Sequence, residues 1–144
     1  MFTHAGVEFE DSTLGFPEFW AKKAAGDYKY GQVPEFTTAD GTKLYHTAAI
    51  MSYLAKTLGD GSMFPTDAMT FYDIDVQIQA NDALMSKYNP FFLPLFPSYH
   101  KKEESDKLFT DFITTHLPAY LENFEATLSK SKGKNLYSDN LTYG

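Results

Sequence analysis

The first third of the chain alternates apolar and polar residues in three short runs, as half-buried β-strands do. The runs are Val7–Asp11, Tyr30–Phe36 and Thr42–His46. The last two are separated by Asp40-Gly41, a dipeptide that favours the tight turn of a β-hairpin. The pattern therefore predicts one strand followed by a two-stranded hairpin.

Helical spacing begins at Thr47, where apolar residues recur three and four positions apart: Ile50, Tyr53, Leu54 and Leu58. Gly59 is placed to end this helix, because glycine readily adopts the left-handed conformation of a helix end. By the same reasoning we expect a helix ending at Gly6 and a short helix within the irregular segment Phe16–Gly26.

The pattern changes after Asp60–Pro65, a segment rich in Gly, Ser and Pro. Thr66–Tyr88 is predicted to be helical, and its apolar residues share one broad face: Met69, Tyr72, Val76, Ala80, Ala83, Leu84 and Tyr88. Asn89–Pro97 contains three prolines and is not expected to be helical. Ser105–Ser129 is helical again, with a kink expected at Pro118. We therefore expect an α/β unit over residues 1–59, a linker over 60–65 and an all-helical unit over 66–144.

Composition narrows the classes of partner. The formal net charge is −7 and no cluster of Lys or Arg overrides it, which argues against nucleic acid and anionic membranes. No apolar run approaches the roughly 20 residues of a membrane span, so no membrane insertion is expected. The chain has no cysteine, which suits the cytoplasm or another reducing compartment. No metal site is expected, because the four histidines are dispersed: His4, His46, His100 and His116.

Four motifs resemble the cytosolic glutathione transferase family, most closely its tyrosine-using sigma, mu and pi classes. They are Ala5-Gly6-Val7-x-Phe9-Glu10-Asp11, Tyr30-Gly31-Gln32-Val33-Pro34-x-Phe36, Asp40-Gly41-x-x-Leu44 and His46-Thr47-x-Ala49-Ile50-x-x-Tyr53-Leu54-Ala55. The resemblance implies a thioredoxin-like glutathione-binding domain over residues 1–59 and a helical domain over 66–144. Both would be incomplete, because the family's first strand should precede Phe2 and its last helices should follow Gly144.

The resemblance also implies that the bond between Val33 and Pro34 is cis. In the family this bond turns adjacent backbone groups toward a peptide ligand, which pairs with them like an added strand. The residues alone favour the alternative, a trans proline opening an edge strand, because only about 5–6% of X-Pro bonds are cis.

His46 and Thr47 stand where the family has Gln or Glu followed by a Ser that binds the γ-glutamyl carboxylate. Thr47 keeps the hydroxyl and is a suitable N-cap residue. Ile50 occupies the position where a capping box needs Glu or Gln, so first-turn N–H groups are left for an anion. His46 is a second implied contact, although a surface histidine at a strand end would look the same.

Trp20 and Lys23 match a Trp and a Lys that reach the glycyl carboxylate of glutathione in the family. The spacing leaves Lys22, or neither lysine, as an alternative, since lysines often cover a solvated face and a Trp often only packs. Gln32 matches a further ligand-contacting position. A local positive charge is expected because an acidic protein that binds an anion needs one.

Three residues are implied at a dimer interface. Tyr30 matches an aromatic side chain that some classes insert into the partner subunit, and it would otherwise be an ordinary strand-edge aromatic. Asp75 and Asp82 lie on the helix where the family places an acid that reaches the neighbouring site, although exposed acids on helices are common.

The resemblance implies that glutathione is the substrate or ligand, and that a complete chain would conjugate it to small hydrophobic electrophiles. The catalytic residue is unknown, because the family's activating hydroxyl lies on the first strand. A thiol with a pKa near 8.5 needs such a donor to become a thiolate at neutral pH. The alternative is a non-catalytic glutathione-transferase-like subunit of a larger assembly.

Overall fold

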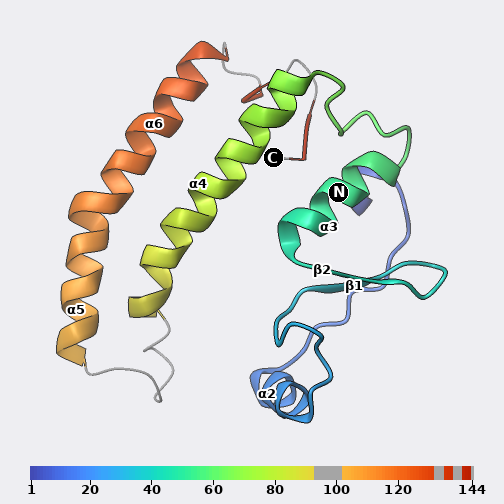
Figure 1. Cartoon of the computed structure of the whole chain (residues 1–144), viewed down its shortest axis with the longest axis horizontal. Coiled ribbons are helices and arrows are strands. Elements are labelled where there is room, and N and C mark those ends of the chain that lie inside the picture. Colours follow the sequence, from blue (N-terminus) through green and yellow to red (C-terminus); the bar gives the residue numbers. More distant parts are fainter. Residues whose placement is uncertain (93–101, 132–134, 138–140, 144) are drawn as a thin grey trace. The chain divides into compact units, whose positions relative to one another are not determined.

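The computed structural model describes residues 1–92, 102–131, 135–137 and 141–143 (Figure 1). The chain divides into two compact units, residues 1–64 together with Tyr143, and residues 65–142. We describe each unit separately.

Two glycines end the helices at the front of the first unit, and the sequence predicts this for Gly6. Helix α1 (Phe2–Ala5) ends at Gly6, whose φ is 65°. Helix α2 (Phe16–Ala25) ends at Gly26, whose φ is 80°. In each case glycine supplies a left-handed conformation that other residues rarely adopt.

The predicted hairpin is present but its strands are short. Strand β1 (Glu35–Thr37) pairs antiparallel with β2 (Lys43–Tyr45), and Phe36 lies opposite Leu44. The longer prediction, Tyr30–Phe36, is wrong before Glu35, because Gly31 has a φ of 64° and Pro34 has no N–H to offer a ladder. Strand pairing is therefore confined to three residues on each side.

The turn of the hairpin is held by its own side chains. Thr38 N donates to Thr42 O at 2.9 Å, and Thr42 N donates to Asp40 Oδ1 at 3.0 Å. The Thr38 hydroxyl and then the Thr42 N–H hold the pKa of Asp40 below its usual value. The Asp-Gly signal is confirmed, since Gly41 has a φ of 86°.

Val7–Asp11 is extended but is not a strand, so that prediction is wrong. Among the described residues the sheet has two strands only, β1 and β2. Val7 N donates to Phe2 O at 3.1 Å, which is the last backbone bond before residue 15. Alternation alone cannot make a strand, because a ladder needs a second backbone alongside it.

Helix α3 (Thr47–Thr57) forms the core of the first unit. Its buried side chains are Ile50, Leu54 and Ala55, and Met63 is buried beyond it. Ile50 and Leu54 belong to the predicted apolar face, so that part of the prediction is confirmed. Tyr53 is 42% exposed, and the helix has Leu58 as its C-cap rather than Gly59, so those parts of the prediction are wrong.

Helix α4 (Ala68–Phe92) opens the second unit. Asp67 caps it, since its Oδ2 accepts a hydrogen bond from Thr70 N at 2.8 Å, and this bond lowers the pKa of Asp67. The helix continues through Pro90, so the expected break at Asn89 is wrong. Pro90 lies two residues from the helix end, where it removes one backbone bond only. Residues 93–97 of that prediction lie outside the described residues.

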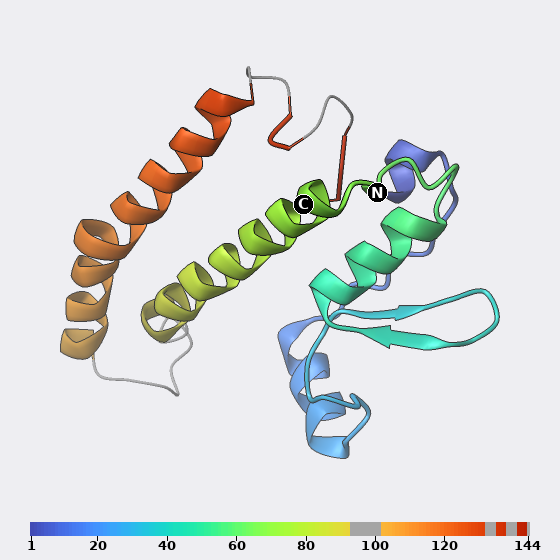
Figure 2. The same cartoon turned by 45° about the horizontal axis from the view of Figure 1, so that its top comes forward.

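A kink is expected at Pro118, and the structure has a π-helical turn just before this residue. Helix α5 (Lys102–Asp111) leads into this turn (η2, Phe112–His116), and α6 (Leu117–Lys130) follows. Pro118 has no N–H for the carbonyl four residues earlier, while Leu117 N bonds Phe112 O, five residues earlier. Figure 2 shows this helical rod beside α4.

The predicted apolar face of α4 is only partly correct: Leu84 and Tyr88 are partly buried, but its first residues are not. Ile74 is fully buried, and Gln77 donates to Tyr120 Oη at 2.7 Å and accepts from Tyr137 Oη at 3.0 Å. By contrast, three residues of the predicted apolar face are exposed: Met69 by 63%, Tyr72 by 58% and Val76 by 46%. Periodicity found the helix but did not reveal which side packs. No helix within the described ranges is long and apolar enough to cross a membrane.

Candidate functional site

The seven side chains implied to contact glutathione all belong to the first unit, and all are exposed: Trp20, Lys23, Gln32, Val33, Pro34, His46 and Thr47. They come from α2, from the segment before β1, and from the junction between β2 and α3. Such an arrangement leaves their polar groups available to a ligand from solution.

Helix α2 presents Trp20 and Lys23 together. Lys23 Nζ lies 5.2 Å from the centroid of the Trp20 ring, within the range of a cation–π interaction. Lys23 Cε lies 3.7 Å from the position that a Cβ on Gly31 would occupy. The structure therefore brings Lys23 next to the turn that precedes Gln32.

Lys22 is engaged differently from its neighbour. Its Nζ lies 3.6 Å from Glu18 Oε1, one helical turn earlier on α2. Among the described residues Lys23 has no carboxylate ion-pair partner, and its ammonium group lies over aromatic rings instead. Of the two lysines left open by the sequence, Lys23 has the charge that an anion could more readily use.

A second aromatic group surrounds the end of β2. The Tyr30 ring lies 5.4 Å from the Tyr45 ring and 4.9 Å from the His46 ring, measured between centroids. Lys29 Nζ lies over both tyrosines, at 5.4 Å from Tyr30 and 5.8 Å from Tyr45. Tyr30, implied to be an interface residue, is 51% exposed yet packs within its own unit.

His46 has an unusual backbone, with φ 65° and ψ 121°. It is the one non-glycine residue of positive φ in the described part of the chain. A conformation of this kind costs on the order of 1–3 kcal/mol and tends to occur at ligand-binding positions. Here it turns the chain from β2 into α3 within one residue.

The N-cap of α3 is His46, so the prediction that Thr47 caps the helix is wrong. Thr47 is the first helical residue, and no side chain caps the N-terminus. Ile50 N donates to His46 O at 2.9 Å, which starts the helical pattern. The N–H groups of the first turn and the exposed Thr47 hydroxyl therefore share one end of α3, where the helix dipole favours a negative charge.

The bond between Val33 and Pro34 is cis, as the resemblance implies and against the expectation from base frequency. Val33 is 48% exposed and lies just before β1. Gln32 precedes it and is also exposed. They follow Gly31, whose backbone lies near the side chain of Lys23 on α2.

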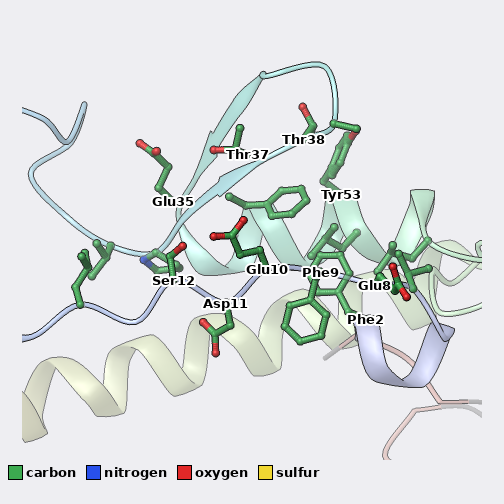
Figure 3. A pocket seen from close by; sticks show the side chains of 18 of the residues that line it. Phe2, Glu8, Phe9, Glu10, Asp11, Ser12, Glu35, Thr37, Thr38 and Tyr53 are labelled. Carbon is green, nitrogen blue, oxygen red and sulfur yellow. The ribbon is translucent and has the colours of Figure 1, made fainter.

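A cavity of about 1370 Å³ opens beside β1 within the first unit. Figure 3 shows the extended residues 8–12 on one side of it and the hairpin on the other. Two of its lining residues hold buried oxygen atoms that lack a hydrogen-bond partner, Tyr28 Oη and Glu35 Oε2. No sequence pattern predicts either atom, because a buried group without a partner depends on tertiary packing.

The remaining implied interface residues, Asp75 and Asp82, are exposed on α4 in the second unit. They lie on the same helix as the exposed Met69, Tyr72 and Val76. Among the described residues no three His, Cys, Asp or Glu side chains gather as they would around a metal ion.

We compared the chain with protein families and with solved structures. Residues 88–144 match the family model described as glutathione S-transferase, C-terminal domain. No curated protein is significantly similar in sequence.

Solved structures match nearly the whole chain. A nematode-specific GST of C. elegans shares 22% identity over 99% of this chain, with a TM-score of 0.80. Prostaglandin synthase D of Nilaparvata lugens shares 22% identity over 99% of the chain, with a TM-score of 0.82. A sigma class GST of Fasciola hepatica shares 23% identity over 99% of the chain, with a TM-score of 0.73. The chain covers 66%, 65% and 64% of these structures, respectively.

The chain therefore has the glutathione transferase fold, with a thioredoxin-like first unit and a helical second unit. The resemblance read from the sequence motifs is confirmed in fold over nearly the whole chain, and residues 88–144 match the family model.

The strained backbone of His46 can be tested with a pair of substitutions that both remove its ring. His46→Gly should leave the protein more stable than His46→Ala by about 1–2 kcal/mol, because only glycine adopts a positive φ without steric cost. Chemical denaturation followed by circular dichroism measures the difference. Equal stability of the two variants would show that this residue is not strained.

Proposed function

We propose that the first unit binds glutathione, with the peptide along Val33 and its γ-glutamyl carboxylate at the N-terminus of α3. The observation that carries this proposal is the junction at His46. A strained residue there leads into an uncapped helix end that carries an exposed hydroxyl. Such an end provides backbone donors and a favourable dipole for a carboxylate.

The second carboxylate of glutathione, on its glycine, is assigned to Lys23. The chain carries 19 acidic against 12 basic residues, so binding an anion requires a locally placed cation. The Lys23 ammonium group lies over Trp20, and its side chain lies near Gly31, the residue before Gln32. We assign the remaining contacts to Trp20, Gln32 and His46.

We further propose that the protein in its complete form conjugates glutathione to small hydrophobic electrophiles. The step forms a bond between the glutathione sulfur and an electrophilic carbon, and the thiol proton is released. A hydroxyl donor must stabilise the thiolate, because a free thiol is mostly protonated at neutral pH. None of the residues discussed above is assigned to that role.

The partner in the assembly is proposed to be a second copy of the protein. The exposed apolar side chains of α4, with Asp75 and Asp82 on the same helix, would form part of the interface, and Tyr30 would contribute from the first unit. Exposed large apolar side chains on one helix favour such contacts. We place the protein in the cytoplasm or another reducing compartment, where glutathione is held in its thiol form.

The Thr47 hydroxyl should be required for tight binding. Thr47→Ala removes a hydrogen bond to a charged carboxylate, worth about 1.5–3 kcal/mol, and should weaken binding roughly 10- to 100-fold. Thr47→Ser keeps the hydroxyl and should bind within a few-fold of the unmodified protein. Isothermal titration calorimetry with glutathione measures both. The same loss for Ala and Ser would remove Thr47 from the site.

Lys23 and Lys22 provide a matched pair for the glycyl carboxylate. Lys23→Ala should weaken glutathione binding a few-fold, as expected for an exposed ion pair of about 0.2–1 kcal/mol, while Lys22→Ala should have no effect. Glutathione amidated at its glycine should bind Lys23→Ala and the unmodified protein equally. The single tryptophan, Trp20, provides the fluorescence signal for these titrations. A larger effect of Lys22→Ala would transfer the role to Lys22.

Turnover separates the enzyme from the alternative of a non-catalytic subunit. The natural protein, supplied with glutathione and an aromatic chloro-nitro electrophile, should form the thioether faster than the uncatalysed reaction. Formation is followed by absorbance, and Thr47→Ala should lower kcat/KM by the same factor as it weakens binding. Binding without any turnover would contradict the proposed enzyme and leave the binding site intact.

A further inference from the structure

His46 is a titratable side chain at the joint where β2 leads into α3 (Figure 1). Its side chain is exposed, and the helix that begins at the next residue has no side-chain cap. The imidazole therefore lies at the helix end to which the proposed function assigns the γ-glutamyl carboxylate of glutathione.

Aromatic contacts restrict the position of the imidazole. Its ring centroid lies 4.9 Å from that of Tyr30, and the two ring planes are inclined by 42°. Tyr30 in turn packs edge-on against Tyr45, the last residue of β2, at 5.4 Å. Because aromatic pairs favour particular geometries, these two tyrosines limit the directions in which the His46 ring points. The imidazole is therefore held at the joint.

The charged group that shares these aromatic contacts with His46 is a cation. Lys29 Nζ lies 5.4 Å from the centroid of Tyr30 and 5.8 Å from that of Tyr45. Like His46, Lys29 forms no ion pair with a carboxylate in the part of the chain that the structure describes. The aromatic group around His46 therefore carries positive charge.

The acidic groups of the neighbouring elements are engaged elsewhere or lie outside the first turn of α3. That turn contains no acidic residue. On the hairpin, Glu35 Oε1 lies 2.7 Å from Lys43 Nζ, and Asp27 adds its negative charge to the surroundings of the same lysine. An imidazolium at position 46 therefore lacks a carboxylate ion-pair partner within the described residues, and a bound ligand could provide one.

Binding of a carboxylate and protonation of an imidazole favour each other. Histidine is the side chain that ordinarily changes charge between about pH 5 and 8. An opposite charge nearby favours the charged form of a group, so a bound carboxylate would favour the imidazolium. By linkage, the imidazolium favours the bound carboxylate to the same extent. Affinity at such a site is higher where the ring is protonated and falls as the pH rises.

We propose that His46 makes glutathione binding proton-linked: a ring nitrogen takes a proton from solvent as the γ-glutamyl carboxylate binds beside it. This inference rests on the proposed function, because it concerns the same carboxylate. It adds that the affinity for glutathione falls as the pH rises from about 5.5 to 7.5. The glycyl carboxylate, which is assigned to Lys23, is not coupled to His46.

The test is isothermal titration calorimetry of the natural protein with S-methylglutathione, a probe that has no thiol proton to release. Titrations near pH 6.5 in two buffers of different ionisation enthalpy give the number of protons exchanged on binding. The unmodified protein should take up a fraction of a proton. Its affinity should fall about two- to fivefold between about pH 5.5 and 7.5, as expected for one exposed charge pair.

Three variants assign the proton to its residue. His46→Gln keeps a hydrogen-bond donor but cannot be protonated, so it should take up no proton and bind equally at both pH values. His46→Asn gives the same comparison with a side chain that tolerates a positive φ better, which guards against a loss of fold. His4→Gln, at an exposed position on α1, should behave like the unmodified protein.

Two modified ligands identify the carboxylate. S-methylglutathione amidated at its γ-glutamyl α-carboxylate should bind the unmodified protein without proton uptake. The analogue amidated at its glycine should keep the uptake, because that carboxylate is assigned to Lys23. Proton uptake that persists with the first analogue would overturn the proposal.

The outcomes separate this inference from the proposed function. Binding of S-methylglutathione without proton uptake, or with uptake that survives in both His46 variants, would overturn the inference and leave the binding site in place. No binding at any pH in this range would contradict the binding site and the inference together.

Discussion

The first unit depends on how the chain turns from β2 into α3 at His46. A single residue with φ 65° makes this turn, so Tyr45 ends the strand and Thr47 begins the helix without a loop between them. Because the joint is so short, the packing of Ile50 and Leu54 in the core also fixes the direction in which the helix N-terminus points. Core and candidate site therefore share one backbone constraint, and the strain at His46 is compensated by burial further along α3.

Local signals in the sequence predicted those features that local forces decide. Asp40-Gly41 gave the hairpin turn because the turn is closed by the side chains of Thr38 and Asp40 themselves. Gly6 correctly predicted a helix end because a left-handed residue is required there. The motif that contains Val33 and Pro34 identified the fold because it matches a family pattern. The secondary-structure propensities of its residues did not identify the fold.

Features that depend on distant partners could not be predicted in the same way. Val7–Asp11 has the alternation of a strand but has no neighbour with which to form a ladder. On α4, apolar residues occur on more than one side of the helix, so periodicity alone does not select the buried side. The packing of Ile74 and the hydrogen bonds of Gln77 with Tyr120 and Tyr137 select it. The orphaned oxygens of Tyr28 and Glu35 likewise arise from the surroundings of each side chain.

The π-helical turn before Pro118 sets the rotational phase of the helix that follows. In an α-helix each residue advances the side-chain direction by about 100°, so a turn that takes in one extra residue rotates everything beyond it by that amount. Tyr120 meets Gln77 because this rotation has already taken place by Leu117. The proline at this position therefore changes the direction in which side chains point. Residues before and after the π-helical turn face different sides of the same long helical segment.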